Sequence, residues 1–112
     1  MITQNLGTVA GDSHTLTVTV KDRDNDAVDI TSASITWKAA RTIHKTAVLT
    51  KTTSNGGIGI TNGAGGVFTI TISAGDTSGF TGDYYHEVQV TFADGTVSTV
   101  LSGTMTVIPA LI

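Results

Sequence analysis

Apolar and polar residues alternate with a period of two along most of this chain, and the pattern is clearest from Phe80 to Val97. Side chains of a β-strand point alternately to its two faces, so every second residue lies on the same side. The predicted core face comprises Tyr84, His86, Val88, Val90 and Phe92, and the opposite face comprises Tyr85, Glu87, Gln89, Thr91 and Ala93. The Asp94-Gly95 pair tolerates the positive φ of a tight hairpin, so a return strand is predicted from Thr96.

The same alternation predicts short strands over most of the remaining sequence, separated by turns rich in glycine, asparagine and aspartate. Predicted strands or extended segments cover residues 7–10, 14–20, 27–30, 33–39, 47–52, 58–60, 67–72 and 96–108. One helical turn is expected around Ala74 to Ser78, and a break in the last strand at Ser102-Gly103. About seven to eight short strands without crossover helices predict an all-β fold, an immunoglobulin-like antiparallel β-sandwich. A small jelly roll would share most of this pattern.

Two aromatic residues favour the immunoglobulin-like form. Tyr84 follows a Gly-Asp corner at the start of the long penultimate strand, where that fold often keeps a tyrosine whose hydroxyl bonds back to the backbone. Trp37 is the only tryptophan and lies mid-strand on an apolar face. We therefore expect Trp37 to fill the space between the two sheets.

Length and composition indicate one domain that needs no covalent support. We expect a single domain over residues 1–112, with residues 1–10 as a loosely held lead-in. The 22 threonines are β-branched and polar, which suits the half-exposed faces of sheets. Cysteine is absent, which excludes disulfides, thiolate catalysis and cysteine-ligated zinc. The net charge of −3 argues against a nucleic-acid partner, because such a partner needs a basic stripe.

Neither a membrane span nor a secretion signal is visible. No segment approaches the roughly 20 continuous apolar residues that cross a bilayer, so no membrane partner is expected. Residues 1–7 have neither the basic nor the apolar region of a signal peptide. The protein is therefore expected to remain in the cytoplasm in which it is made.

The acidic turn at residues 22–26 is the leading candidate for a metal site. Asp22, Asp24 and Asp26 stand at alternate positions, and calcium prefers such hard oxygen ligands. A calcium loop would also need a glycine at its sixth position, where this chain has Ala27, and a glutamate at its twelfth. A hairpin turn whose Asp and Asn side chains bond their own backbone explains the same residues and is preferred. We therefore predict no bound metal and no cofactor.

The remaining residues give catalysis little support. The three histidines, His14, His44 and His86, lack the spacing of a zinc site. His14 and His86 fall on predicted inward faces, where a hydrogen-bonded structural role is expected. No nucleophile elbow places a hydroxyl beside a histidine and a carboxylate. The glycine-rich loop 62–66 precedes a strand, whereas a phosphate-binding loop precedes a helix. We predict that the protein is not an enzyme.

Two surface segments are candidates for contacts with other proteins. Residues 41–45 form the only basic cluster, which either contacts an acidic neighbour or remains a solvated strand end. Residues 107–112 are almost entirely apolar, which predicts packing on the domain itself or addition to a neighbouring sheet. A carbohydrate-binding or adhesive module is the alternative function. Only 5% of the chain is aromatic, however, and Tyr85 alone is expected to face outward beside polar residues.

Several segments together resemble the N-terminal immunoglobulin-like domain of phage baseplate upper proteins. The segments that carry the resemblance are residues 11–13, 16–22, 27–37, 65–76, 82–88 and 92–97. The family pattern combines a polar turn, an Asp-Leu-Thr-Gly-Ala motif, a later Gly-x-Tyr and a final Asp-Gly-x-Val. The matching residues here are Asp29-Ile30-Thr31-Ser32-Ala33, Gly82-Asp83-Tyr84 and Asp94-Gly95-Thr96-Val97. Ile30 therefore replaces the leucine of the family, and Ser32 replaces its glycine.

The resemblance spans roughly residues 11–108 and belongs to the scaffold, so it brings no catalytic residues. It implies a structural protein of a phage or prophage virion, either a tail or baseplate component or a head-tail accessory domain. The implied location is the virion, after assembly in the host cytoplasm. The implied partners are other virion proteins and further copies of the chain in a homo-oligomer.

Overall fold

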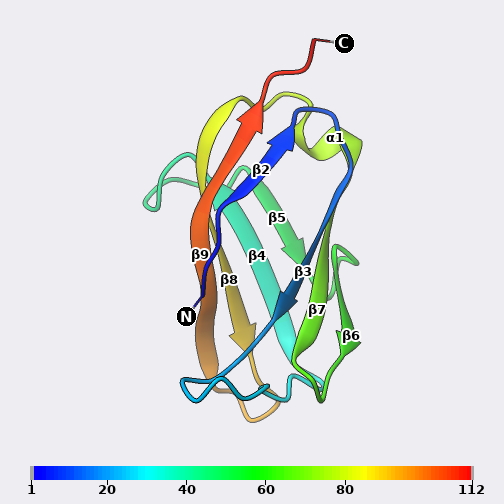
Figure 1. Ribbon diagram of the computed structural model, residues 1–112, viewed down its shortest axis with the longest axis vertical. Helices are drawn as coiled ribbons and strands as arrows, with labels where there is room; N and C mark the ends of the chain where they lie inside the picture. Colours follow the sequence, from blue (N-terminus) through cyan, green and yellow to red (C-terminus); the bar gives the residue numbers. More distant parts are fainter. Residues whose placement is uncertain (1, 112) are drawn as a thin grey trace.

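The chain forms two β-sheets that face each other across one hydrophobic core (Figure 1). The computed structural model describes residues 2–111. The larger sheet has the strand order β1-β9-β8-β4-β5, and β2 also pairs with β9. Its strands are β1 (Ile2–Thr3), β2 (Leu6–Val9), β4 (Ser34–Ala40), β5 (Leu49–Thr52), β8 (Gly82–Thr91) and β9 (Val97–Ile108). The smaller sheet, of order β3-β7-β6, consists of β3 (His14–Thr19), β7 (Val67–Ile72) and β6 (Ile58–Asn62).

The strand pairs are antiparallel, except that β1 and β2 run parallel to β9. The short helix α1 (Ala74–Thr77) connects β7 of the smaller sheet with β8 of the larger one, as the sequence predicted. No helix within residues 2–111 has the length and apolar character needed to cross a membrane. Two packed antiparallel sheets with the N-terminal segment laid along the last strand define an immunoglobulin-like sandwich. The predicted all-β immunoglobulin-like fold is confirmed.

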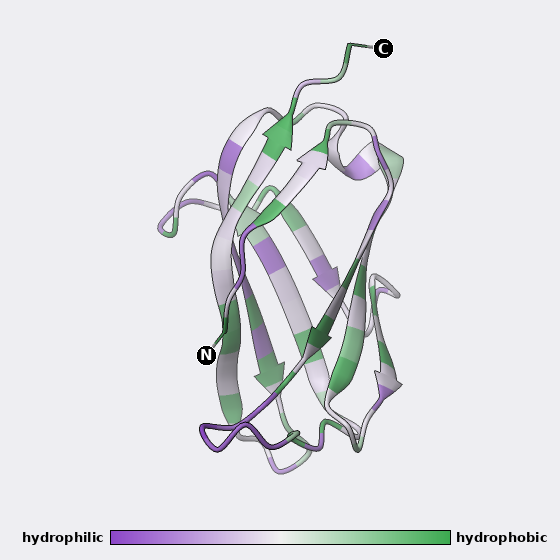
Figure 2. Cartoon of the chain, in the orientation of Figure 1, coloured by the Kyte–Doolittle hydropathy of each residue, from purple (hydrophilic) through white to green (hydrophobic). Residues whose placement is uncertain are grey.

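The core is built from the alternating positions of the facing strands. The predicted inward face of β8 is confirmed, because Tyr84, His86, Val88 and Val90 are buried. Trp37 of β4 is fully buried between the sheets, also as expected. Strand β7 contributes Phe68, Ile70 and Ile72 from the other side. Apolar residues follow the strands, whereas the loop at the lower end between β3 and β4 is strongly hydrophilic (Figure 2).

The hairpin between β8 and β9 closes as the sequence predicts. The backbone N–H of Phe92 donates to the carbonyl of Thr96 over 2.8 Å, and Gly95 has a φ of 90°. The Asp94 carboxylate accepts the N–H of Thr96 at 2.9 Å, which fixes the turn from within.

Two expectations about the strands were wrong. Residues 27–30 form no strand and make only an isolated bridge from Ala27 to Lys21. Their backbone forms hydrogen bonds with a loop instead: the Ile30 N–H donates to the carbonyl of Gly63 at 2.8 Å. The expected break at Ser102-Gly103 is also absent, since β9 is continuous from Val97 to Ile108. The irregularity in its pairing with β8 lies at Val100 instead, beside Leu101.

The N-terminal lead-in is more firmly attached than the sequence suggested. Residues 2–9 form two short strands along β9, separated by Gln4 and Asn5. Leu6 and Thr8 are buried. The strand predicted over residues 7–10 corresponds to β2, whereas β1 spans only two residues, too few for alternation to predict a strand.

Candidate functional site

The buried side chain of His86 stands at the centre of a short network of hydrogen bonds in the core. The indole Nε1–H of Trp37 donates to Nδ1 of His86 at 3.0 Å. The other ring nitrogen, Nε2, lies 2.8 Å from the carbonyl oxygen of Gln4. His86 is fully buried. This network joins β4, β8 and the N-terminal segment, so it stabilises the attachment of residues 2–9 to the larger sheet.

The partners of His86 determine its protonation state. An indole N–H can only donate, so Nδ1 must be the acceptor. The neutral ring then carries its hydrogen on Nε2, which donates to the Gln4 carbonyl. Burial lowers the pKa of His86 below its ordinary value of 6.5, and the Gln4 carbonyl offsets only part of this effect. His86 is therefore a neutral histidine with the hydrogen-bonded structural role that was expected, and among residues 2–111 no nucleophile contacts its ring nitrogens.

A glycine makes room for the N-terminal segment where it crosses β9. Gly103 lies opposite His86 in the sheet, and a Cβ atom added at Gly103 would collide with the Gln4 carbonyl. The Gln4 N–H donates to the carbonyl of Ser102 at 2.9 Å, and the Asn5 side chain accepts the N–H of Thr104 at 3.1 Å. Gly103, interpreted from the sequence as part of a strand break, is thus a point where the backbone of the N-terminal segment passes close to β9.

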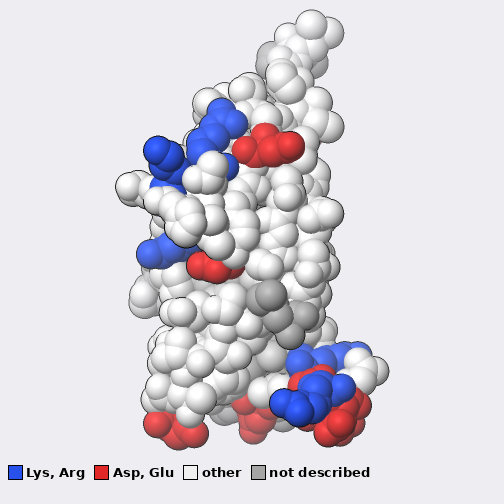
Figure 3. Space-filling model, turned by 90° about the vertical axis from the view of Figure 1, so that its left-hand side faces the viewer, with Lys and Arg blue, Asp and Glu red and all other residues white. Residues whose placement is uncertain are grey.

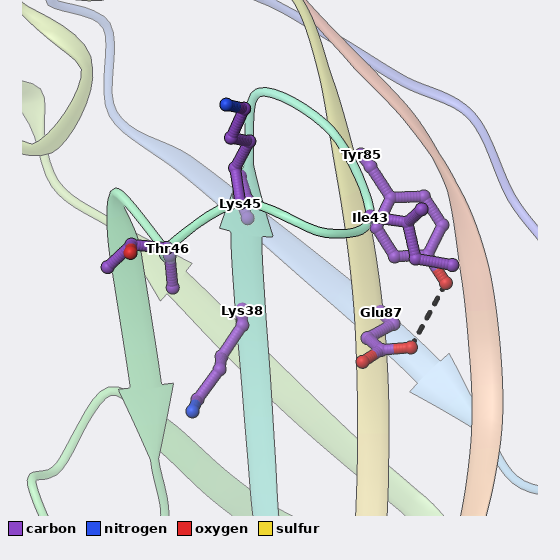
Figure 4. Close-up of a pocket in the computed structure, with 9 residues that line it drawn as sticks. Lys38, Ile43, Lys45, Thr46, Tyr85 and Glu87 are labelled. Atoms are coloured by element: carbon purple, nitrogen blue, oxygen red, sulfur yellow. Dashed lines mark hydrogen bonds between the residues drawn. The ribbon is translucent and has the colours of Figure 1, made fainter.

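The outer face of the larger sheet carries an open hollow of about 340 Å³ (Figure 4). It lies between the β4–β5 loop and β8, with Ile43 and Tyr85 at one side. The Tyr85 hydroxyl donates to the Glu87 carboxylate at 3.0 Å. Partial burial, followed by the hydrogen bond to Glu87 and the negative charge of that carboxylate, raises the pKa of Tyr85 above its ordinary value of 10.0. Lys38 and Lys45 also line the hollow, with their amino groups turned away from this pair.

The basic cluster at 41–45 is only partly free for contacts. The Arg41 guanidinium carbon lies 4.3 Å from the ring centroid of Tyr84, and the Phe80 ring stacks on Tyr84 at 5.1 Å. The expected bond from the Tyr84 hydroxyl to the backbone is not formed within residues 2–111, so that prediction was wrong; ring contacts hold Tyr84 instead. Ile43, by contrast, is 61% exposed. Figure 3 shows positive side chains in the upper part of this face and again, among acidic side chains, at its lower end.

The acidic turn at residues 22–26 is stabilised by hydrogen bonds to the side chain of Asp22. One oxygen of Asp22, Oδ1, accepts the backbone N–H groups of Asp24 and Asp26 at 2.9 and 3.0 Å. Within residues 2–111, no group of three or more histidine, aspartate or glutamate side chains is arranged to hold a metal ion. The structure therefore brings the calcium candidates Asp22, Asp24 and Asp26 into a backbone turn rather than around a common centre.

The other predicted site residues do not converge. His14 is half-buried at the start of β3, and His44 is exposed in the β4–β5 loop. The glycine-rich loop 62–66 packs against the segment before β4: a Cβ at Gly66 would lie 2.6 Å from the carbonyl oxygen of Val28. That loop is therefore a structural contact rather than an open cradle.

Comparisons with known proteins assign the chain to no family. No protein-family model and no curated protein matches the chain. Among solved structures, it is similar to the first immunoglobulin domain of mouse SynCAM 2, with 18% sequence identity and a TM-score of 0.43. The alignment covers 98% of this chain and 95% of that domain. The class of the protein is thus an immunoglobulin-like β-sandwich domain, an assignment that rests on its own strand order.

Proposed function

We propose that the protein is a non-enzymatic structural component of a phage or prophage virion that acts by protein–protein assembly. Its place would be in the tail or baseplate, or at the head-tail connection as an accessory domain. A sandwich fold alone does not assign a function. The proposal therefore depends on the sequence resemblance and on surfaces suited to protein contacts.

The conformation of Ser32 supports the resemblance to phage baseplate upper proteins. Ser32 has a φ of 63°, in the left-handed region that serine rarely adopts. It replaces the glycine of the family motif, and glycine adopts such a conformation without strain. The chain thus keeps, with another residue, the backbone geometry for which the glycine of that pattern is suited.

The observation that carries the assembly role is an apolar segment that projects from the body of the domain. Ile108 is 54% exposed, and Leu111 is fully exposed. This segment extends beyond the end of the sandwich in Figure 1. Such apolar exposure is unfavourable in water and is typical of surfaces that another protein covers. The expected alternative of packing on the domain itself is not favoured by this arrangement.

A carbohydrate-binding module remains the alternative function. The observation in its favour is the Tyr85 ring beside the Glu87 carboxylate in the hollow on the larger sheet. Sugar-binding surfaces usually combine several aromatic rings with polar groups. The hollow contains a single aromatic side chain, so this function has less support.

The proposal predicts that the purified protein binds particles that lack it. Virions from a strain in which the gene is disrupted should take up the protein until a fixed number of copies per particle is reached. The control is a variant truncated after Ile108, which removes the projecting residues and should bind more weakly. Binding that does not saturate, or no binding at all, would contradict the assembly role.

A further inference from the structure

Strand β3 leaves one edge of the smaller sheet open. Within the described residues 2–111 it pairs only with β7, in a regular antiparallel register from His14 to Thr19. The Val20 N–H continues this ladder by donating to the Gly66 carbonyl at 2.8 Å. Because alternate residues of an antiparallel pair exchange hydrogen bonds, the even-numbered residues of β3 direct their backbone groups at β7. The backbone N–H and C=O groups of Thr15, Thr17 and Thr19 therefore face away from the sheet.

The other sheet edges carry features that discourage pairing, and β3 carries none. Strand β5 has four residues, and the N–H of its Thr52 is already bonded to the Asn55 side chain. Strand β6 has an irregularity between Ile60 and Asn62. The β1–β2 edge is interrupted at Gln4 and Asn5. Strand β3 has six residues without a lysine, proline, bulge or other protective device, which makes its edge a template for another strand.

We propose that the β3 edge pairs with β3 of a second copy of the chain, related by a two-fold axis at Thr17. In this register Thr17 faces Thr17 of the second copy, and Thr15 faces Thr19. All three outward-facing backbone pairs are then satisfied, with about six main-chain hydrogen bonds. The outward side chains are threonines, which form favourable cross-strand pairs, and no charged residue of β3 meets a like charge.

The surface beside the edge fits a second copy. A hollow of about 610 Å³ lies next to the end of β3 and is lined by Ile2, Thr19, Lys21, Asp22, Arg23 and Asn25. In the proposed register Ser13 of the second copy faces Lys21, and its Asp12 faces Asp22 beyond the paired residues 15–19. Lys21 and Arg23, on either side of Asp22, offset the repulsion between these two carboxylates. The Asp22 oxygen Oδ1 is already engaged by two backbone N–H groups of its own turn.

This inference rests on the proposed assembly function and is tested by charge pairs placed on the two-fold axis. Sedimentation equilibrium from about 1 µM to about 1 mM should show a mass rising from 11.5 kDa towards twice that value. In a dimer of Thr17→Lys, or of Thr17→Glu, the two copies place the same charge opposite each other at residue 17. Each should raise the dimer dissociation constant on the order of tenfold. An equimolar mixture of the two variants should form the dimer again, as a heterodimer.

The matched controls are Thr71→Lys and Thr71→Glu, at an exposed position of the central strand β7. Neither should change the dissociation constant, and circular dichroism should show that all four variants are folded. A wild-type chain that stays monomeric throughout would overturn the β3 dimer. So would a dimer that is insensitive to Thr17, or variants that do not recombine on mixing. The last two results would leave the virion proposal standing, because binding to particles is measured separately.

Discussion

Replacement of His86 by phenylalanine is expected to lower the free energy of unfolding by about 3 kcal/mol. Phenylalanine fills similar space but offers neither an acceptor nor a donor. The Trp37 indole N–H and the Gln4 carbonyl, bonded to His86 at 3.0 and 2.8 Å, would both lose their partner. Each buried polar group left unsatisfied costs about 1–3 kcal/mol. Chemical denaturation followed by far-UV circular dichroism measures the loss, and this probe also serves variants that lack Trp37, the only tryptophan.

The same variant should also change the pH dependence of stability. The pKa of His86 is lowered from 6.5 in the folded protein, so the unfolded chain binds a proton that the folded one does not. The stability contributed by the neutral ring is complete above about pH 6.5 and falls as the pH drops towards the lower, folded pKa. The slope reaches at most about 1.4 kcal/mol per pH unit. In His86→Phe this slope should disappear.

A double-mutant cycle with Trp37→Phe separates the hydrogen bond from the change in packing. When both side chains are replaced, the orphaned indole N–H no longer exists, so the two losses should not add. Additive losses, or a pH slope that persists in His86→Phe, would show that the network does not act through His86.

Replacement of Gly103 by alanine is expected to detach the N-terminal segment from β9. A methyl group at Gly103 would overlap the Gln4 carbonyl, which is backbone and has no alternative rotamer. We expect a loss of about 2–3 kcal/mol in unfolding free energy, as for an overpacked core. Amide hydrogen exchange should accelerate at Gln4 and Leu6 more than in the centre of β8.

Gly7→Ala is the matched control for this substitution. Gly7 lies in β2, three residues beyond Gln4, and a Cβ atom there would meet nothing within 4 Å. Its stability should stay within about 0.5 kcal/mol of the wild type. Equal effects of the two substitutions would contradict a specific role for the crossing at Gly103.

The sequence predicted the parts of this fold that depend on local patterns. Alternation assigned the inward face of β8, and the Asp94-Gly95 pair located the hairpin. Alternation also placed Trp37 correctly between the sheets, because it lies on the apolar face of its strand. The segment 27–30 was misassigned because Ile30 is buried, and Val28 partly buried, without forming a strand ladder. Ile30 reaches the core from a loop whose backbone bonds to Gly63.

The candidate sites were harder to predict than the strands, because they depend on contacts between residues far apart in the sequence. Sequence reasoning identified His86 as an inward, hydrogen-bonded histidine, but not its partners, which lie 49 and 82 residues away. Gly103 gave a misleading signal, because glycine in a strand marks either a break or a close approach. The open edge of β3 could not be predicted either, since it depends on the N-terminal segment pairing with β9 rather than with β3.

Quantitative mass spectrometry of purified virions tests the central claim, a structural role in the particle, most directly. Particles from the strain that carries the gene should contain the protein in a fixed ratio to the major tail protein. That ratio should survive repeated gradient purification, because an assembled component is not removed by washing. Absence of the protein from intact particles, or a ratio that falls with each purification step, would contradict the account.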